Sequence, residues 1–136
     1  MIDFQFIEVK KISTSNTKEW LAKVIKNEGM QLGEIVYIFC NDEYLTKKNI
    51  EFLNHDTLTD VITFDYCKEK NINGDIFIST ERVKENAKTY NTNYMTELYR
   101  VMVHGLLHLH GYKDKSREEK ELMKSKENYY ISIKWF

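Results

Sequence analysis

The chain has 136 residues, of which 42% are hydrophobic and 30% are charged, and its formal net charge is −1 at pH 7. This length and composition predict one folded domain, residues 1–136, and the charge excludes a protein that holds nucleic acid by bulk positive charge alone. No stretch approaches the roughly 18 apolar residues that cross a membrane, and residues 1–11 lack the pattern of a signal peptide, so we expect a soluble cytoplasmic protein without membrane contact.

Hydrophobic periodicity predicts the elements in chain order. The first half alternates strands with helices, as strand 2–9, helix 13–29, strand 33–40 and helix 41–54. Two strands then follow without a helix between them, and the remainder is helical, which gives the segments 58–66, 73–79, 79–91, 94–111 and 115–133.

This order of elements predicts an α+β fold. Strands that a helix separates usually lie parallel, whereas two strands joined by a short loop form an antiparallel hairpin. We therefore expect a mixed four-stranded sheet with three parallel strands plus one antiparallel hairpin strand, packed with about five helices.

The stretch VHGLLHLHGYKD holds three of the chain's four histidines and ends with an aspartate. At about 100° per residue, His104 and His108 lie on one face of the predicted helix, one turn apart and within reach of one ion. Gly111 can adopt a left-handed conformation, end the helix and return Asp114 to that ion. His110 is the poorer candidate, because it lies about 240° round the helix from His104. Three such ligands with an open position for water are how catalytic zinc sites are built.

The alternative is a helix that is rich in histidine and binds nothing. Two histidines four residues apart are a common pattern, and such a pair by itself does not make a metal site. The glycine and the aspartate that follow favour a site, because they supply the turn and the third ligand that a straight helix lacks. Spacing alone leaves both interpretations open.

The same stretch resembles the signature HGxLHLxGYDH of the YbeY family, bacterial endoribonucleases that mature ribosomal RNA. Upstream, DTLTDVITFDY is similar to the family segment D-x-P-T-[DN]-V-L-[ST]-F, and GDIFIS is similar to its G-D-I-x-I strand. The three segments, from Asn49 to Asp114, fall in the family's order and spacing. The resemblance implies a zincin-like metal helix, one Zn²⁺ per chain held by His104, His108 and Asp114, and a substrate cleft beside the ion.

The resemblance also implies a metal-dependent endoribonuclease specific for single strands, which acts in 3′-end maturation of 16S rRNA and in ribosome quality control. Its partners would be the 16S rRNA precursor and the small ribosomal subunit, and a ribosomal protein or a second ribonuclease is left open. The three ligands would act in catalysis through metal-bound water. Thr59, Asp60 and Lys113 are candidate substrate-binding residues, with turn chemistry as the close alternative for the first two.

Two positions depart from the family pattern. The third ligand is usually histidine, whereas Asp114 cancels one unit of the metal's charge, so bound water should be less acidic or a different divalent ion could serve. The family usually carries an arginine where this chain has Leu53, which cannot stabilise the negative charge of a transition state. His55 could act as a catalytic donor if protonated, or be a loop histidine without a role. Lys113 and Arg117 could also reach the phosphate.

Two other functions compete with this interpretation. Zinc peptidases place a glutamate directly after the first histidine, as HExxH, and this chain has Gly105 there. A non-catalytic, zinc-stabilised ribosome assembly factor would close its metal with four protein ligands, whereas the sequence offers three and no convincing fourth. Both comparisons favour the endoribonuclease.

Overall fold

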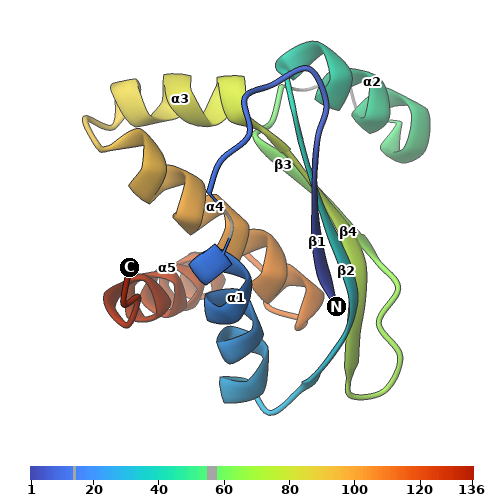
Figure 1. Cartoon of the computed structure of the whole chain (residues 1–136), viewed down its shortest axis with the longest axis vertical. Coiled ribbons are helices and arrows are strands. Elements are labelled where there is room, and N and C mark those ends of the chain that lie inside the picture. The colour runs from blue at the N-terminus through green and yellow to red at the C-terminus, as the bar shows by residue number, and fades with distance from the viewer. Residues whose placement is uncertain (14, 55–57) are drawn as a thin grey trace.

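In the computed structural model of the chain, residues 1–13, 15–54 and 58–136 are described, and four strands and five helices lie within them (Figure 1). In chain order these are β1 (Ile2–Phe6), α1 (Ser15–Asn27), β2 (Gln31–Cys40), α2 (Asp42–Leu53), β3 (Val61–Asp65), β4 (Asn71–Ser79), α3 (Thr80–Thr89), α4 (Tyr94–Leu109) and α5 (Arg117–Ser132). The first strand ends at Phe6 rather than at residue 9, because Glu8 adopts a left-handed backbone conformation, with φ of 57°, that breaks the strand.

The strands form one mixed sheet in the order β1-β2-β4-β3. β1 and β2 are parallel, as are β2 and β4, whereas β3 is antiparallel to β4, with Val61 opposite Ile78 and Asp65 opposite Gly74. The predicted α+β fold, with three parallel strands and one antiparallel hairpin strand, is therefore confirmed. The connections give the reason, because a helix lies between the strands of the β1–β2 pair, whereas a short turn joins β3 to β4.

Helices cover the two faces of the sheet unequally. The main core lies between one face and the layer that contains α1, α4 and α5, while α2 covers part of the other face (Figure 1). Successive residues of β4 alternate between these two environments, since Ile76 and Ile78 belong to the main core and Phe77 packs with the smaller cluster at α2. The helix layer on the main-core side is the one that carries the histidine-rich stretch.

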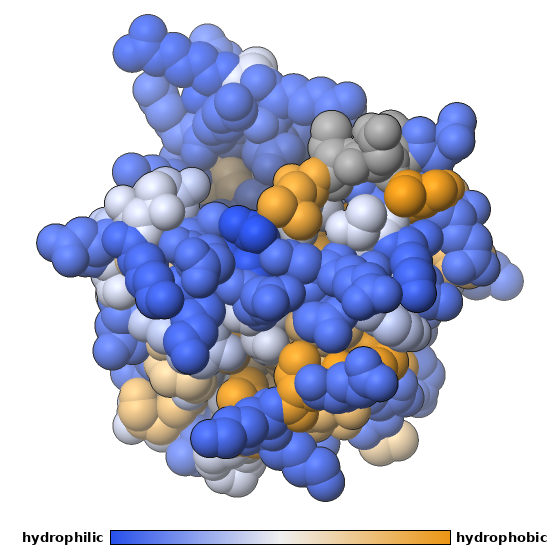
Figure 2. Space-filling model, turned by 90° about the horizontal axis from the view of Figure 1, so that it is seen from above, coloured by the Kyte–Doolittle hydropathy of each residue, from blue (hydrophilic) through white to orange (hydrophobic). Residues whose placement is uncertain are grey.

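Most of the charged residues lie on the exterior. Seen from above, it is largely hydrophilic with hydrophobic residues in separate groups (Figure 2), as expected when 30% of the residues are charged. Across the described residues, no helix combines the length and the apolar character needed to cross a lipid bilayer.

Local signals fix both ends of α4. Asn93 caps its start by accepting hydrogen bonds from two backbone N–H groups, at 2.9 and 3.2 Å. At its end Gly111 has φ of 98°, its N–H donates to the carbonyl of His108 at 3.0 Å, and the next N–H donates to the carbonyl of Leu107 at 3.1 Å. This pair of hydrogen bonds is a Schellman motif, which reverses the chain so that the residues after Gly111 return toward α4.

The middle of α4 lies very close to the sheet at Gly105. A Cβ atom at this position would lie 2.9 Å from Cγ2 of Ile76 and 3.5 Å from methyl groups of Thr63 and Val61. Position 105 therefore faces the sheet, and a side chain there would have to displace core atoms. The adjacent His104 is partly exposed, at the edge of the same helix.

Candidate metal centre

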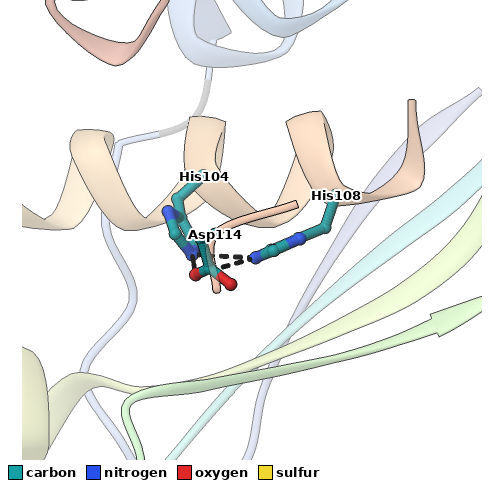
Figure 3. A group of neighbouring side chains, drawn as sticks. All are labelled: His104, His108 and Asp114. Atoms are coloured by element: carbon teal, nitrogen blue, oxygen red, sulfur yellow. Dashed lines mark hydrogen bonds and ion pairs between the residues drawn. The ribbon is translucent and has the colours of Figure 1, made fainter. Parts of the chain in front are cut away.

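Three predicted ligands meet at one point beside α4. His104 and His108 project from successive turns of the helix, and the segment after Gly111 brings Asp114 to them (Figure 3). Oδ2 of Asp114 lies 3.2 Å from Nε2 of His104 and 3.3 Å from Nε2 of His108, and the two Nε2 atoms are 3.0 Å apart. Among the described residues, these three form the one group of histidine, cysteine and acidic side chains close enough to share an ion.

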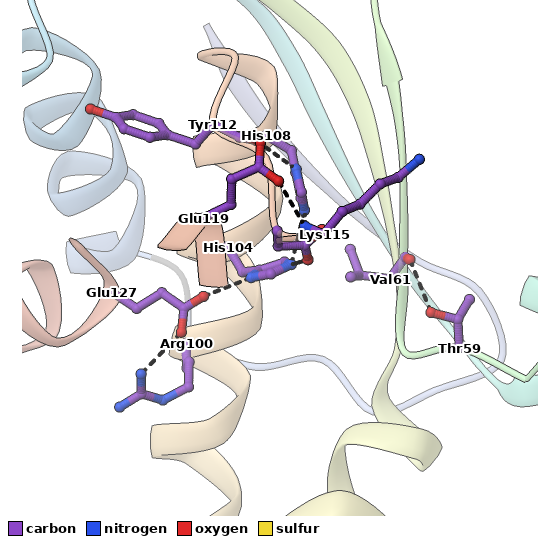
Figure 4. A network of polar contacts seen from close by, with 10 residues as sticks. Thr59, Val61, Arg100, His104, His108, Tyr112, Lys115, Glu119 and Glu127 are labelled. Atoms are coloured by element: carbon purple, nitrogen blue, oxygen red, sulfur yellow. Dashed lines mark hydrogen bonds and ion pairs between the residues drawn. The ribbon is translucent and has the colours of Figure 1, made fainter. Parts of the chain in front are cut away.

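Hydrogen bonds on the far side of each ring determine which nitrogen faces the centre. Nδ1 of His104 lies 2.6 Å from Oε2 of Glu127, and Nδ1 of His108 lies 2.9 Å from the backbone carbonyl of Tyr112 (Figure 4). A carboxylate and a carbonyl only accept hydrogen bonds, so each Nδ1 carries a proton, and in the neutral form of each ring the lone pair is on Nε2. Both lone pairs therefore point at Asp114.

This arrangement fits a tetrahedral cation. Three electron-rich atoms about 3 Å apart repel one another unless a positive charge lies between them. A tetrahedral ion with bonds of about 2.0–2.1 Å has ligand–ligand distances of roughly 3.3–3.4 Å, close to the 3.0, 3.2 and 3.3 Å found among these atoms. The donor set, two imidazoles and a carboxylate, is one that zinc accepts.

The electrostatic surroundings of His104 also favour a cation. Burial by itself lowers the pKa of His104, but the hydrogen bond and the charge of Glu127, with the charges of Asp114 and Asp60, outweigh burial and raise it. Three carboxylates thus act on one imidazole. A metal ion at Nε2 would meet the same negative field that a proton does.

A cleft of about 620 Å³ opens beside the three ligands. Its lining includes His104 and Asp114, and it also includes residues of α4 and α5, among them Arg100, Lys120 and Lys124. The lining is mixed in charge, because the carboxylates of Asp60, Glu97, Asp114 and Glu127 belong to it as well.

Of the three predicted substrate-binding residues, Asp60 belongs to the lining of this cleft, and Thr59 and Lys113 do not. Asp60 lines it, accepts a hydrogen bond from Asn86 at 3.5 Å, and has a pKa raised by burial. The hydroxyl of Thr59 donates to the carbonyl of Val61 at 3.4 Å, which is the turn chemistry expected as the alternative (Figure 4). Lys113 is exposed in the turn beside Asp114.

The structure describes the position of the family arginine, Leu53, and only some of the residues considered as its replacements. Leu53 is the last residue of α2, with 38% of its surface exposed. His55 lies outside the described residues, so its catalytic role stays a prediction. Arg117 is at the start of α5, where its Nε pairs with Glu121 at 3.3 Å.

Glu127 is the residue of this site that the sequence did not identify. In the structure Met123, Glu127 and Tyr130 are the buried residues of α5, four and three positions apart. Their helical spacing is a signal that could have placed this glutamate on the inner face.

Glu28 holds the loop that carries Asp114. Its carboxylate accepts hydrogen bonds from the hydroxyls of Tyr112 and Tyr130 and from Nζ of Lys126, the last at 3.2 Å. Burial raises the pKa of Glu28, but these three hydrogen bonds and the charge of Lys126 outweigh burial, so its pKa is lowered. This carboxylate connects the end of α1 to the metal loop and to α5.

Replacing Glu28 with glutamine should therefore destabilise the protein in a pH-dependent way. A carboxylate with a lowered pKa stabilises the fold above its unfolded-state pKa, and this contribution disappears as the pH falls through its folded-state pKa. We expect Glu28→Gln to lower the free energy of unfolding by about 1–2 kcal/mol at pH 7, and the difference from wild type to shrink below about pH 4. Thermal unfolding across this pH range measures the loss of stability and its pH dependence, with the exposed Glu51→Gln as control. A loss of stability that does not depend on pH would contradict the stabilising role of the ionised Glu28 carboxylate.

The fold and the three converging side chains define an α+β domain with a group that could hold a metal ion and a cleft beside that group. The family model described as Endoribonuclease YbeY matches residues 3–133, and the chain therefore belongs to the YbeY endoribonuclease family. The resemblance inferred from its motifs is confirmed.

Individual relatives cover nearly the whole chain. It is 56% identical over 115 residues to the Endoribonuclease YbeY of Flavobacterium johnsoniae, which covers 85% of this chain and 83% of the relative. It is 50% identical over 134 residues to that of Flavobacterium psychrophilum, with 98% and 96% covered. The solution structure of TM1509 from Thermotoga maritima is similar in fold, with a TM-score of 0.72 and 29% sequence identity over 99% of this chain and 89% of that one.

Proposed function

We propose that this chain, residues 1–136 as one domain, is a zinc-dependent endoribonuclease that cuts single-stranded RNA in the cytoplasm. Its proposed substrate is the 16S rRNA precursor of the small ribosomal subunit, in 3′-end maturation and ribosome quality control. Membership of the YbeY family supports the nuclease activity. The observation that supports a bound metal ion is the convergence of two Nε2 atoms and one carboxylate oxygen within about 3 Å of one another.

Each residue then has a defined task. His104, His108 and Asp114 hold the ion, which would supply a Lewis acid and lower the pKa of water at neutral pH. Lys120 and Lys124, in the wall of the cleft, bring positive charge toward the phosphate of a bound strand. Asp60 lines the same cleft, and Asp60, Thr59 and Lys113 are proposed to contact the substrate. A ribosomal protein or a second ribonuclease as a further partner stays a prediction.

The peptidase alternative conflicts with the packing of α4. A peptidase of the HExxH type needs a glutamate directly after the first histidine as the general base. In this chain that position is Gly105, where even a Cβ would lie 2.9 Å from Ile76 of the sheet. The residue that follows His104 therefore cannot supply such a base. Cleavage of an RNA phosphodiester depends less on a neighbouring carboxylate as general base, because a metal ion can polarise the phosphate.

The alternative of a structural zinc requires a fourth protein ligand. In the described part of the chain, the group that could share the ion has three members. Glu127 is the adjacent carboxylate, and its two oxygens are directed at Nδ1 of His104 and at Arg100, away from the Nε2 side of the ring. This geometry favours a site that keeps a position for water or substrate.

Removal of the metal tests the proposal. Purified chain should contain about one zinc ion per molecule by elemental analysis and should cleave a 16S rRNA precursor. A strong chelator should reduce cleavage to background, because the side chains of the cleft do not replace the metal ion as a Lewis acid. Added Zn²⁺ should restore cleavage, with Mn²⁺ and Mg²⁺ compared at equal occupancy. Undiminished cleavage by fully metal-free protein would show that the site has another purpose.

A further inference from the structure

Glu127 occupies an unusual place for a charged side chain. It lies on the inner face of α5, and 8% of its side chain is exposed. Its Oε2 is 2.6 Å from Nδ1 of His104, and its Oε1 accepts a hydrogen bond from Arg100 at 3.0 Å (Figure 4). Arg100 also donates to Oδ1 of Asn128 at 2.8 Å. Both oxygens of this buried carboxylate are therefore occupied, one by the candidate metal ligand and one by a guanidinium.

The two candidate imidazole ligands are held by different kinds of acceptor. His108 donates its Nδ1 proton to a backbone carbonyl, that of Tyr112, which the turn after α4 places automatically. His104 instead depends on a side chain of another helix, 23 positions further along the chain. A charged acceptor at Nδ1 fixes the ring's tautomer and orientation and makes Nε2 a stronger electron donor to a metal than a neutral acceptor does.

Arg100 determines which side of the ring the carboxylate stays on. Nδ1 and Nε2 lie on different edges of the imidazole, and the ion pair with Arg100 holds Glu127 at the Nδ1 edge. Because Arg100 is itself bonded to Asn128, this anchor does not depend on the carboxylate alone. The group able to share an ion, among the residues that the structure describes, accordingly omits Glu127. The guanidinium also offsets the charge of Glu127, so Asp114 is the carboxylate that would contact an ion directly.

From these contacts we propose that Glu127 is a positioning residue of the metal centre, and that Arg100 keeps it from becoming a fourth ligand. The inference rests on the proposed function, because it assumes that Nε2 of His104 binds a metal. Glu127 sets the tautomer and the direction of His104 and so raises the affinity of the site. Arg100 preserves the open coordination position beside it.

The test compares Glu127→Gln and Glu127→Ala with a control ion pair remote from the site. Asp42 offers a close match, since its two oxygens accept hydrogen bonds from Arg82 and from Ser79, both at 2.8 Å, and it is likewise largely buried. Asp42→Asn should lower thermal stability without changing the affinity for zinc. Glu127→Gln should weaken zinc binding roughly tenfold and Glu127→Ala roughly 10–100-fold, measured by competition with a chromogenic chelator.

A second measurement reads the position of the proton directly. Long-range ¹H–¹⁵N spectra of the metal-free protein at alkaline pH should show His104 in its Nδ1–H form in the wild type. In Glu127→Ala the Nε2–H form should gain population, while His108 should keep its Nδ1–H form because its acceptor is backbone. Asp42→Asn should leave both rings unchanged.

The outcomes distinguish a failure of the role inferred for Glu127 from a failure of the proposed metal site. Wild-type zinc affinity and an unchanged His104 tautomer in both Glu127 variants, with a loss of stability like that of Asp42→Asn, would reduce Glu127 to a structural ion pair and overturn the inference. A wild-type chain that binds no zinc, manganese or magnesium would overturn the proposed metal site instead. If Glu127→Ala does not fold, Glu127→Gln decides, because it retains the volume and a hydrogen-bond acceptor.

Discussion

Replacing His108 with alanine is expected to abolish both metal retention and RNA cleavage while the sheet remains folded. The change removes one of three ligands and leaves an imidazole and a carboxylate, so the affinity for zinc should fall by more than roughly 100-fold. Alanine has the highest helix propensity, and His108 is partly exposed, with 26% of its side chain accessible, so α4 should persist. Elemental analysis after dialysis, cleavage of a 16S rRNA precursor and circular dichroism measure the three expectations.

His110 provides the matched control for this experiment. It lies two residues further along, and its Nδ1 is 2.8 Å from the carbonyl of Leu106, away from the three ligands. His110→Ala therefore removes an imidazole from the same end of α4 without removing a ligand. We expect it to keep about one metal ion per chain and near wild-type cleavage. Full cleavage by metal-free His108→Ala would contradict the proposed centre, as would equal losses in both variants.

The periodicity of the sequence was sufficient for the fold and for much of the site. The hairpin and the helix-separated strands follow from the order of elements, and the helical spacing of His104 and His108 follows from the geometry of α4. The return of Asp114 could be anticipated because Gly111 is a local signal for a helix end, and the structure gives it a positive φ of 98°. The spacing of the two histidines and the return of Asp114 depend on neighbours within about ten residues, where pattern and structure are tightly linked.

The features that the sequence did not predict depend on contacts between distant segments. Glu127 reaches His104 from a separate helix, and Glu28 reaches Tyr112 across 84 positions. Periodicity can show that Glu127 lies on the inner face of α5, but it cannot show that this face meets α4 at His104. Similarly, no local pattern indicates that a left-handed Glu8 ends β1 at Phe6. Tertiary packing determines these residues' roles, so the sequence alone leaves them undefined.

Exchanging Asp114 for histidine should keep the metal and move the pH dependence of cleavage to lower pH. Asp114 touches Nε2 of both His104 and His108 and is 39% exposed, so an imidazole can reach the ion from the same turn without disturbing the core. A carboxylate cancels one unit of the ion's charge, whereas imidazole cancels none. The more positive site favours the deprotonated form of water and lowers its pKa.

The expected shift in the acidic limb of the pH–rate profile is about one unit, which corresponds to roughly fivefold faster cleavage one unit below the wild-type midpoint. Profiles must be compared at equal metal occupancy, because a change in occupancy would alter the rate without moving the midpoint of a fully loaded enzyme. Asp114→Ala serves as the control that loses the third ligand altogether, and it should lose metal as His108→Ala does. If fully loaded Asp114→His gave the wild-type midpoint, the charge of the third ligand would not govern the acidity of the site. Asp114 would then contribute to the site through its position, which the turn at Gly111 fixes, and not through its charge.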